Sequence, residues 1–204
     1  MTTKTEFDYE VTDSGPGYNR PQQMGNRLWG PMFALAIMAF PVALILSWVR
    51  AATIADATGV PDLEDAAQLG HLVGGFGFLG FLGVFSAISF AIARILGRFR
   101  KGGGEIQESV GNDVHTLKMP VTAKIFIIFM MMGMMALAGS VVGHFVAAAG
   151  VGSWSLESVA RWAEVLDGIK RIGVAMYLFG IAFGLGTIIT VLRFQTHRVA
   201  QLAR

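Results

Sequence analysis

The sequence has 204 residues, contains no cysteine and has few charged residues. Without cysteine the chain forms no disulfide, and it holds no thioether-attached haem, cysteine-ligated iron–sulfur cluster or thiolate zinc site. Charged residues make up 15% and hydrophobic residues 53% of the chain. Soluble domains have roughly 25% charged residues, so this composition excludes an ordinary soluble domain. It indicates an integral membrane protein whose cofactor ligands, if any, are histidine, methionine or carboxylate.

Several signatures of enzymes and pumps are also missing. The sequence has no nucleophile motif, phosphate-binding loop, zinc-protease signature or nucleotide-binding fingerprint. No acidic residue or lysine lies in the middle of an apolar run, which argues against an ion pump, since a relay needs ionisable groups across the membrane. The cluster of basic residues at 94–101 is explained by membrane topology, because cytoplasmic loops are rich in lysine and arginine. We therefore expect no nucleic-acid partner, and these residues suit contact with anionic lipid head groups.

Four apolar runs are long enough to cross a bilayer, which takes about 20 residues per helix. They cover residues 28–49, 70–95, 121–150 and 172–192. The connections between them are short, which favours antiparallel neighbours. The sequence therefore predicts an all-α membrane protein with a four-transmembrane-helix antiparallel bundle.

The segments outside the spans complete this prediction. Residues 102–118, with three consecutive glycines, are expected to form a solvated loop. Between 153 and 170, apolar and charged residues alternate at helical spacing, which predicts an interfacial amphipathic helix before the last span. The expected organisation is a polar tail over 1–28, one transmembrane domain over 29–193 and a basic tail over 194–204.

Lysine and arginine are distributed unevenly between alternate sides of the predicted bundle. Twelve of the 16 lie in the two tails, the middle loop and the adjoining span ends. Because basic loops stay in the cytoplasm, we expect both termini to be cytoplasmic and the protein to lie in a bacterial inner membrane. The four residues expected on the outer side are Arg50, Arg161, Lys170 and Arg171.

Two histidines lie inside the predicted spans. His71 opens the second span and His144 lies about two turns before the end of the third, which runs in the opposite direction. Both should therefore lie near the outer face, at similar depth, on antiparallel helices. Each follows a glycine, Gly70 and Gly143. Such small neighbours permit either close helix approach or a slot for a flat cofactor.

A haem b held by two neutral imidazoles on facing helices needs this arrangement. His71 and His144 are therefore candidate haem axial ligands. Haem propionates would need cations at the outer interface. The candidate propionate partners are Arg50, Lys170 and Arg171.

Two other interpretations stay open. Glycine-rich faces are ordinary packing devices, and a histidine near a helix end can hydrogen-bond a carbonyl or water. Alternatively, His71 with Glu64 and Asp65 forms a histidine and carboxylate set for copper, zinc or iron. Against that second interpretation, acidic residues at the start of a helix are usually caps or solvated charges.

The four-helix plan with His71 and His144 paired on the outer side resembles the small cytochrome b membrane subunits that anchor respiratory oxidoreductases. Those families often bind two haems with four histidines, whereas this chain offers one pair. The resemblance implies one haem b near the outer face, a quinone pocket beside it, and a partner subunit that carries the redox chemistry.

The leading hypothesis is thus a membrane-embedded subunit of a multi-subunit oxidoreductase complex, which is not catalytic alone. Other subunits of that complex, lipid and quinone are its expected partners. The alternatives are a cofactor-free structural or assembly subunit of a larger membrane complex, and a subunit of a membrane metal enzyme.

Overall fold

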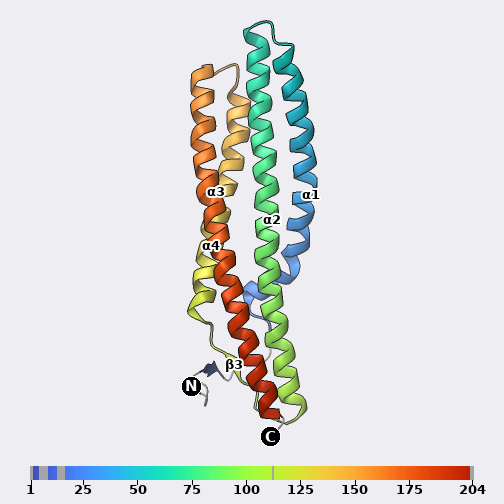
Figure 1. Cartoon of the computed structure of the whole chain (residues 1–204), viewed down its shortest axis with the longest axis vertical. Helices are drawn as coiled ribbons and strands as arrows, with labels where there is room; N and C mark the ends of the chain where they lie inside the picture. Colours follow the sequence, from blue (N-terminus) through green and yellow to red (C-terminus); the bar gives the residue numbers. More distant parts are fainter. Residues whose placement is uncertain (1, 5–8, 13–16, 112, 203–204) are drawn as a thin grey trace. The chain divides into compact units, whose positions relative to one another are not determined.

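The computed structural model describes residues 2–4, 9–12, 17–111 and 113–202. Parts of the two predicted tails, at 5–8, 13–16 and 203–204, lie outside the described residues. All four helices are long and apolar enough to cross a membrane, so the predicted all-α membrane fold with four spans is confirmed. In chain order the elements are β1 (Thr2–Lys4), β2 (Glu10–Thr12), α1 (Arg20–Ala55), α2 (Val60–Ser109), β3 (Thr116–Leu117), α3 (Val121–Gly150) and α4 (Leu156–Leu202) (Figure 1).

Helix α1 begins earlier than the first predicted span. Asn19 precedes it, and its side-chain Oδ1 accepts a hydrogen bond from the backbone N–H of Gln22 at 3.1 Å. The side-chain Oε1 of Gln22 in turn accepts one from the backbone N–H of Asn19 at 3.0 Å. This reciprocal pairing is a capping box, which satisfies backbone donors that the first helical turn leaves free. It explains why α1 starts inside the predicted polar tail.

The predicted loop at 102–118 is wrong for its first half, because α2 continues to Ser109. The three glycines therefore lie within a helix. An ion pair between Lys101 and Glu105, 3.4 Å apart and one turn along the helix, bridges this stretch. The chain leaves the helical conformation at Gly111, whose φ of 75° lies in the left-handed region that favours glycine.

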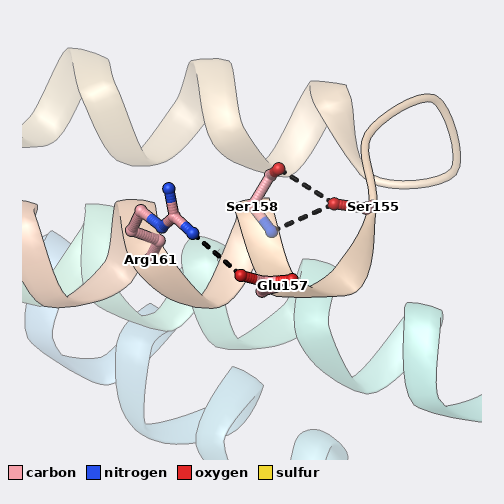
Figure 2. Close-up of polar contacts among 4 residues, drawn as sticks. All are labelled: Ser155, Glu157, Ser158 and Arg161. Carbon is pink, nitrogen blue, oxygen red and sulfur yellow. Dashed lines mark hydrogen bonds and ion pairs between the residues drawn. The ribbon is translucent and has the colours of Figure 1, made fainter.

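The predicted interfacial helix is not a separate element. Residues 156–170 form the first turns of α4 and continue into the last span without a break. No proline interrupts the segment, and the charged residues one turn apart pair along its surface. The helix starts at a serine cap: Ser155 Oγ accepts a hydrogen bond from the backbone N–H of Ser158 at 3.2 Å (Figure 2).

The chain forms two compact units, and all four helices contribute residues to both. The first unit comprises Met1–Trp29, Ile88–Phe129 and Phe179–Arg204. The second unit comprises Gly30–Ala87 and Met130–Leu178. The boundaries predicted at residues 28 and 193 fall inside α1 and α4.

In the second unit, glycines allow the helices to approach closely. A Cβ at Gly83 of α2 would lie 2.8 Å from the backbone oxygen of Met32 in α1. A Cβ at Gly133 of α3 would lie 2.8 Å from the ring of Tyr177 in α4. The Tyr177 hydroxyl is fully buried and pairs with Ser86 Oγ of α2 at 2.9 Å. This unit therefore has a closely packed interior that contains the polar pair of Ser86 and Tyr177.

In the first unit, short strands and polar contacts accompany the helices. The strands β1, β2 and β3 form a small antiparallel sheet in that order. Gln195 Nε2 of α4 donates to the backbone oxygen of Phe99 in α2 at 2.9 Å. Thr187 Oγ1 donates to Thr122 Oγ1 of α3 at 3.0 Å. These side-chain hydrogen bonds link α4 to both α2 and α3 within the unit.

Candidate functional site

His71 of α2 and His144 of α3 lie in direct contact in the second unit. Their Nδ1 atoms are 3.1 Å apart and their ring centroids are 5.2 Å apart. Both side chains are buried, with 3% and 5% of their surface exposed. The structure thus brings together the two histidines that the sequence singles out. It joins them as a hydrogen-bonded pair.

The hydrogen bonds of the pair determine which nitrogen carries each proton. His71 Nε2 lies 3.3 Å from the backbone oxygen of Val159 in α4, and a carbonyl oxygen only accepts. When both rings are neutral, His71 therefore carries its proton on Nε2, and its Nδ1 is an acceptor. His144 must then donate from Nδ1 to His71. The remaining ring nitrogen, His144 Nε2, is left as a hydrogen-bond acceptor.

This acceptor nitrogen has no protein partner among the described residues. His144 Nε2 is buried and has no hydrogen-bond partner in the part of the chain that the structure describes. Most buried polar atoms have a partner, because leaving one unpaired carries the full desolvation penalty of the group. An unpaired ring nitrogen beside a hydrogen-bonded imidazole therefore indicates a site for a hydrogen-bond donor or another electrophile.

A cavity of about 380 Å³ lies beside the pair. Its polar lining comes from His71, His144 and Arg50, and the guanidinium of Arg50 is the one charged group among the lining residues that the structure describes. Small-molecule sites of about 300–1,000 Å³ with apolar walls and a few polar groups are typical of ligand pockets. The apolar lining is formed mainly by the first turns of α4, at Leu156, Val159, Ala160 and Ala163.

Arg50 is the predicted cation that the structure brings to this cavity. Its Nε donates to the backbone oxygen of Ala66 at 3.2 Å, which holds the side chain against α2. A Cβ at Gly70 would lie 3.1 Å from the same Nε, so the glycine provides the space for the arginine. The guanidinium nitrogens other than Nε are available for a ligand oxygen.

Lys170 and Arg171, the other two predicted cations, do not line the cavity. Both pair with Asp167: Lys170 Nζ lies 2.6 Å from its carboxylate, and an Arg171 nitrogen lies 2.7 Å from it. Lys170 also lies over the ring of Phe78, 4.6 Å from the centroid. The edge of that ring meets His144 at 4.8 Å between centroids. Lys170 and His144 therefore both contact the ring of Phe78.

The alternative metal set does not come together. Among the described residues, which include His71, Glu64 and Asp65, no group of three or more histidines and carboxylates is placed to hold a metal ion. His71 instead uses both ring nitrogens for hydrogen bonds to His144 and Val159. A site made by these three residues is not formed in this arrangement.

The arrangement also does not fit a haem held between the two histidines. Histidine nitrogens bind metals such as zinc at about 2.0–2.1 Å, so two of them on opposite sides of an ion lie about 4 Å apart. The facing nitrogens here are 3.1 Å apart and share a proton. The space over the neighbouring glycines is filled by protein: by the His144 ring over Gly74, Phe145 over Gly75 and Leu166 over Gly143.

Sequence reasoning did not anticipate several of the residues that shape this site. The Val159 carbonyl, which sets the protonation of the pair, lies on a helix 88 residues from His71 in the chain. Phe78, whose ring packs against His144, was also not predicted, and outside the site the same holds for the buried pair of Ser86 and Tyr177. Polar residues inside apolar spans were the available signal, and both members of the Ser86–Tyr177 pair fit that description.

Comparison with known proteins identifies no family or relative for the chain. The chain matches no protein-family model, and no curated protein or solved structure is significantly similar to it.

Proposed function

We propose that the chain is a membrane-embedded subunit of a multi-subunit oxidoreductase complex, and that its second unit binds a quinol beside His71 and His144. One observation carries the proposal: the buried Nε2 of His144 is an acceptor without a partner among the described residues, and His144 lines a cavity together with Arg50 and apolar side chains. A quinol has hydroxyl donors on an apolar ring, which matches an acceptor nitrogen between apolar walls.

In this proposal each polar group of the cavity has one task. His144 Nε2 accepts a hydrogen bond from one quinol hydroxyl. The free guanidinium nitrogens of Arg50 donate to the second oxygen, where negative charge develops as its proton leaves. The walls formed by Leu156 and Val159 exclude water from the ring and leave it in apolar surroundings.

Oxidation of a quinol to a quinone releases two electrons and two protons. The first proton passes to Nε2 of His144, which then gives its Nδ1 proton to Nδ1 of His71 across the 3.1 Å contact. His71 now carries both of its protons, and the Val159 carbonyl stabilises that cation through Nε2. The second proton leaves the oxygen held by Arg50, whose side chain is exposed, and passes to water, because His144 Nε2 still carries the first proton. Both electrons pass to the redox centre of a partner subunit, because the proposal assigns no electron acceptor to this chain.

Binding of decylubiquinol or a menaquinol analogue to the purified full chain tests the proposal. Wild-type protein should bind about one molecule per chain. His144→Ala should weaken binding at least about tenfold, which corresponds to about 1.4 kcal/mol and to the loss of one good hydrogen bond. The control is His197→Ala, because His197 belongs to the first unit. Equal binding by wild type and His144→Ala, or no binding by wild type, contradicts the proposal.

A cofactor-free structural subunit is the second candidate, and the filled glycine positions favour it. If Gly74, Gly75 and Gly143 serve only helix packing, the chain should co-purify with partners yet bind no quinol. Metal analysis and a reduced-minus-oxidised spectrum then distinguish a cofactor-free subunit, for which both are blank, from a subunit that carries a metal or haem. Bands of b-type haem that vanish in both His71→Ala and His144→Ala would replace the quinol proposal by a haem site.

We also infer from the distribution of basic residues that both termini face the cytoplasm of a bacterial inner membrane. The absence of native cysteine makes this testable with single introduced cysteines. In intact cells, a membrane-impermeant maleimide should label Arg161→Cys, whose native side chain is 74% exposed, and should not label Val110→Cys. The reverse labelling pattern contradicts the orientation.

A further inference from the structure

A second cavity, of about 120 Å³, lies within the first unit. One part of its lining is polar and basic, with Arg100, Gln195 and Arg198. Another part is apolar, with Leu96, Phe126 and Val191. No aspartate or glutamate occurs among its lining residues in the part of the chain that the structure describes. Two arginines and an apolar wall therefore line the same cavity.

Arg198 is the decisive residue, because its guanidinium is buried and unpaired. The side chain is 3% exposed, and Nε, Nη1 and Nη2 all lack a hydrogen-bond partner among the described residues. Arginine is almost never fully buried unless it is paired. The face of the guanidinium lies 4.6 Å from the ring centroid of Phe194, which leaves its N–H edges for another group.

The helix opposite is shaped to admit this arginine. Gly103 of α2 faces Arg198 so closely that a Cβ at that position would overlap the Nη1 atom. Gln195, one turn earlier in α4, is anchored to the backbone oxygen of Phe99 at 2.9 Å. The three-glycine stretch that sequence analysis assigned to a loop thus provides the space in which a buried cation lies.

We propose that this cavity is a binding site for a phosphate-type oxyanion, held by Arg198. A guanidinium offers a fork of donors that matches phosphate oxygens, and the anion would balance the buried charge of Arg198. The size also fits. One water needs about 15 Å³ of such volume, and this cavity provides about eight times that for a group of five heavy atoms. The apolar part of the lining suits an acyl chain attached to the phosphate.

The shared chemistry has two sources, a free phosphate ion and the head group of an anionic phospholipid, and two measurements separate them. In the first, the full chain in detergent is titrated with inorganic phosphate at constant ionic strength, and its thermal unfolding temperature is followed. In the second, the chain is reconstituted with phosphatidylglycerol and phosphatidylcholine and repurified, and the retained phosphorus per chain is measured. Both measurements compare wild type with Arg198→Gln, and with Arg193→Gln as a matched control on an exposed position of the same helix.

If free phosphate is the ligand, the unfolding temperature of wild type and Arg193→Gln rises with phosphate, and the apparent Kd of Arg198→Gln is at least about tenfold weaker. If lipid is the ligand, about one phosphatidylglycerol per chain stays with wild type and Arg193→Gln and is lost from Arg198→Gln. Gly103→Ala, whose Cβ overlaps the guanidinium, should reproduce that loss even if Arg198→Gln fails to fold.

One combined result overturns the proposal. If the cavity contains only water, the unpaired buried charge of Arg198 destabilises the fold. Arg198→Gln should then unfold at a higher temperature than wild type. Neither phosphate nor phosphatidylglycerol should then bind to wild type more strongly than to the variant. The sign of the stability change therefore distinguishes an occupied oxyanion site from a hydrated void.

Discussion

Replacing Gly74 with alanine should break the contact between the two buried histidines. A Cβ at this position would lie 2.6 Å from Cε1 and 2.8 Å from Nδ1 of His144. Carbon atoms in contact are normally about 3.5–4.0 Å apart, so the ring has to move by about 1 Å. The ring of Phe78 packs against the same imidazole, 4.8 Å away between centroids, and limits where it can go. A displacement of this size separates Nδ1 of His144 from Nδ1 of His71.

The expected loss of stability combines three effects. Overpacking a closely packed site costs about 1–3 kcal/mol. Loss of the hydrogen bond between the rings adds about 0.5–1.5 kcal/mol. Alanine in place of glycine within a helix stabilises the folded state by about 0.5–1 kcal/mol, which offsets part of this loss. The free energy of unfolding should therefore fall by about 0.5–4 kcal/mol.

Gly77→Ala provides the matched control on the same helix. A Cβ at Gly77 would meet nothing within 4 Å, so only the gain in helix propensity applies. Reversible unfolding of the full chain in detergent measures both variants, and ¹⁵N chemical shifts of the imidazole nitrogens report the contact between the rings. Gly74→Ala should be less stable than Gly77→Ala by about 1.5–4.5 kcal/mol, because the gain in helix propensity is common to both. Equal stability, with unchanged imidazole shifts in Gly74→Ala, refutes the reasoning.

Three further predictions concern polar contacts. Tyr177→Phe leaves the hydroxyl of Ser86 unpaired and should destabilise the protein by about 0.6–1.7 kcal/mol, the range for hydrogen bonds between membrane helices. In a double-mutant cycle with Ser86→Ala, the combined loss should be smaller than the sum, and strict additivity would exclude the bond. Ser155→Ala removes the cap of α4 and should cost about 0.5–2 kcal/mol, with faster hydrogen exchange confined to its first turns. Arg161→Ala breaks only an exposed ion pair with Glu157, so its unfolding temperature should match that of wild type at any salt concentration (Figure 2).

The spans could be predicted from sequence because the information is local. A run of about 20 apolar residues has few structures available to it in a bilayer, since its backbone must satisfy its own hydrogen bonds. The helix ends were less predictable. Three consecutive glycines, of which Gly103 is the second, are typical of a loop. Gly103 nevertheless lies in α2, where Gln195 and Arg198 of α4 pack against it. That contact joins residues more than ninety positions apart, and no local pattern contains it.

The site was predictable in position but not in chemistry. Antiparallel spans and equal depth were enough to bring His71 and His144 together. What the rings do depends on features that the pattern does not contain. Leu166 occupies the space over Gly143 that a flat cofactor was expected to use, and Val159 fixes the protonated nitrogen of His71. Both residues belong to the part of α4 that was predicted to form a separate interfacial helix at 153–170.

The direction of the hydrogen bonds carries more functional information than the identity of the two histidines. A pair of imidazoles alone is compatible with haem, with a metal ion or with simple packing. One carbonyl, that of Val159, fixes the donor at His71 Nε2 and thereby makes His144 Nε2 an acceptor. His144 and Arg50 line the same cavity, so the two side chains together offer a ligand one acceptor and one set of donors. A molecule with a hydroxyl at one end and a developing oxyanion at the other fits both, which is why the proposed substrate is the reduced form of the quinone.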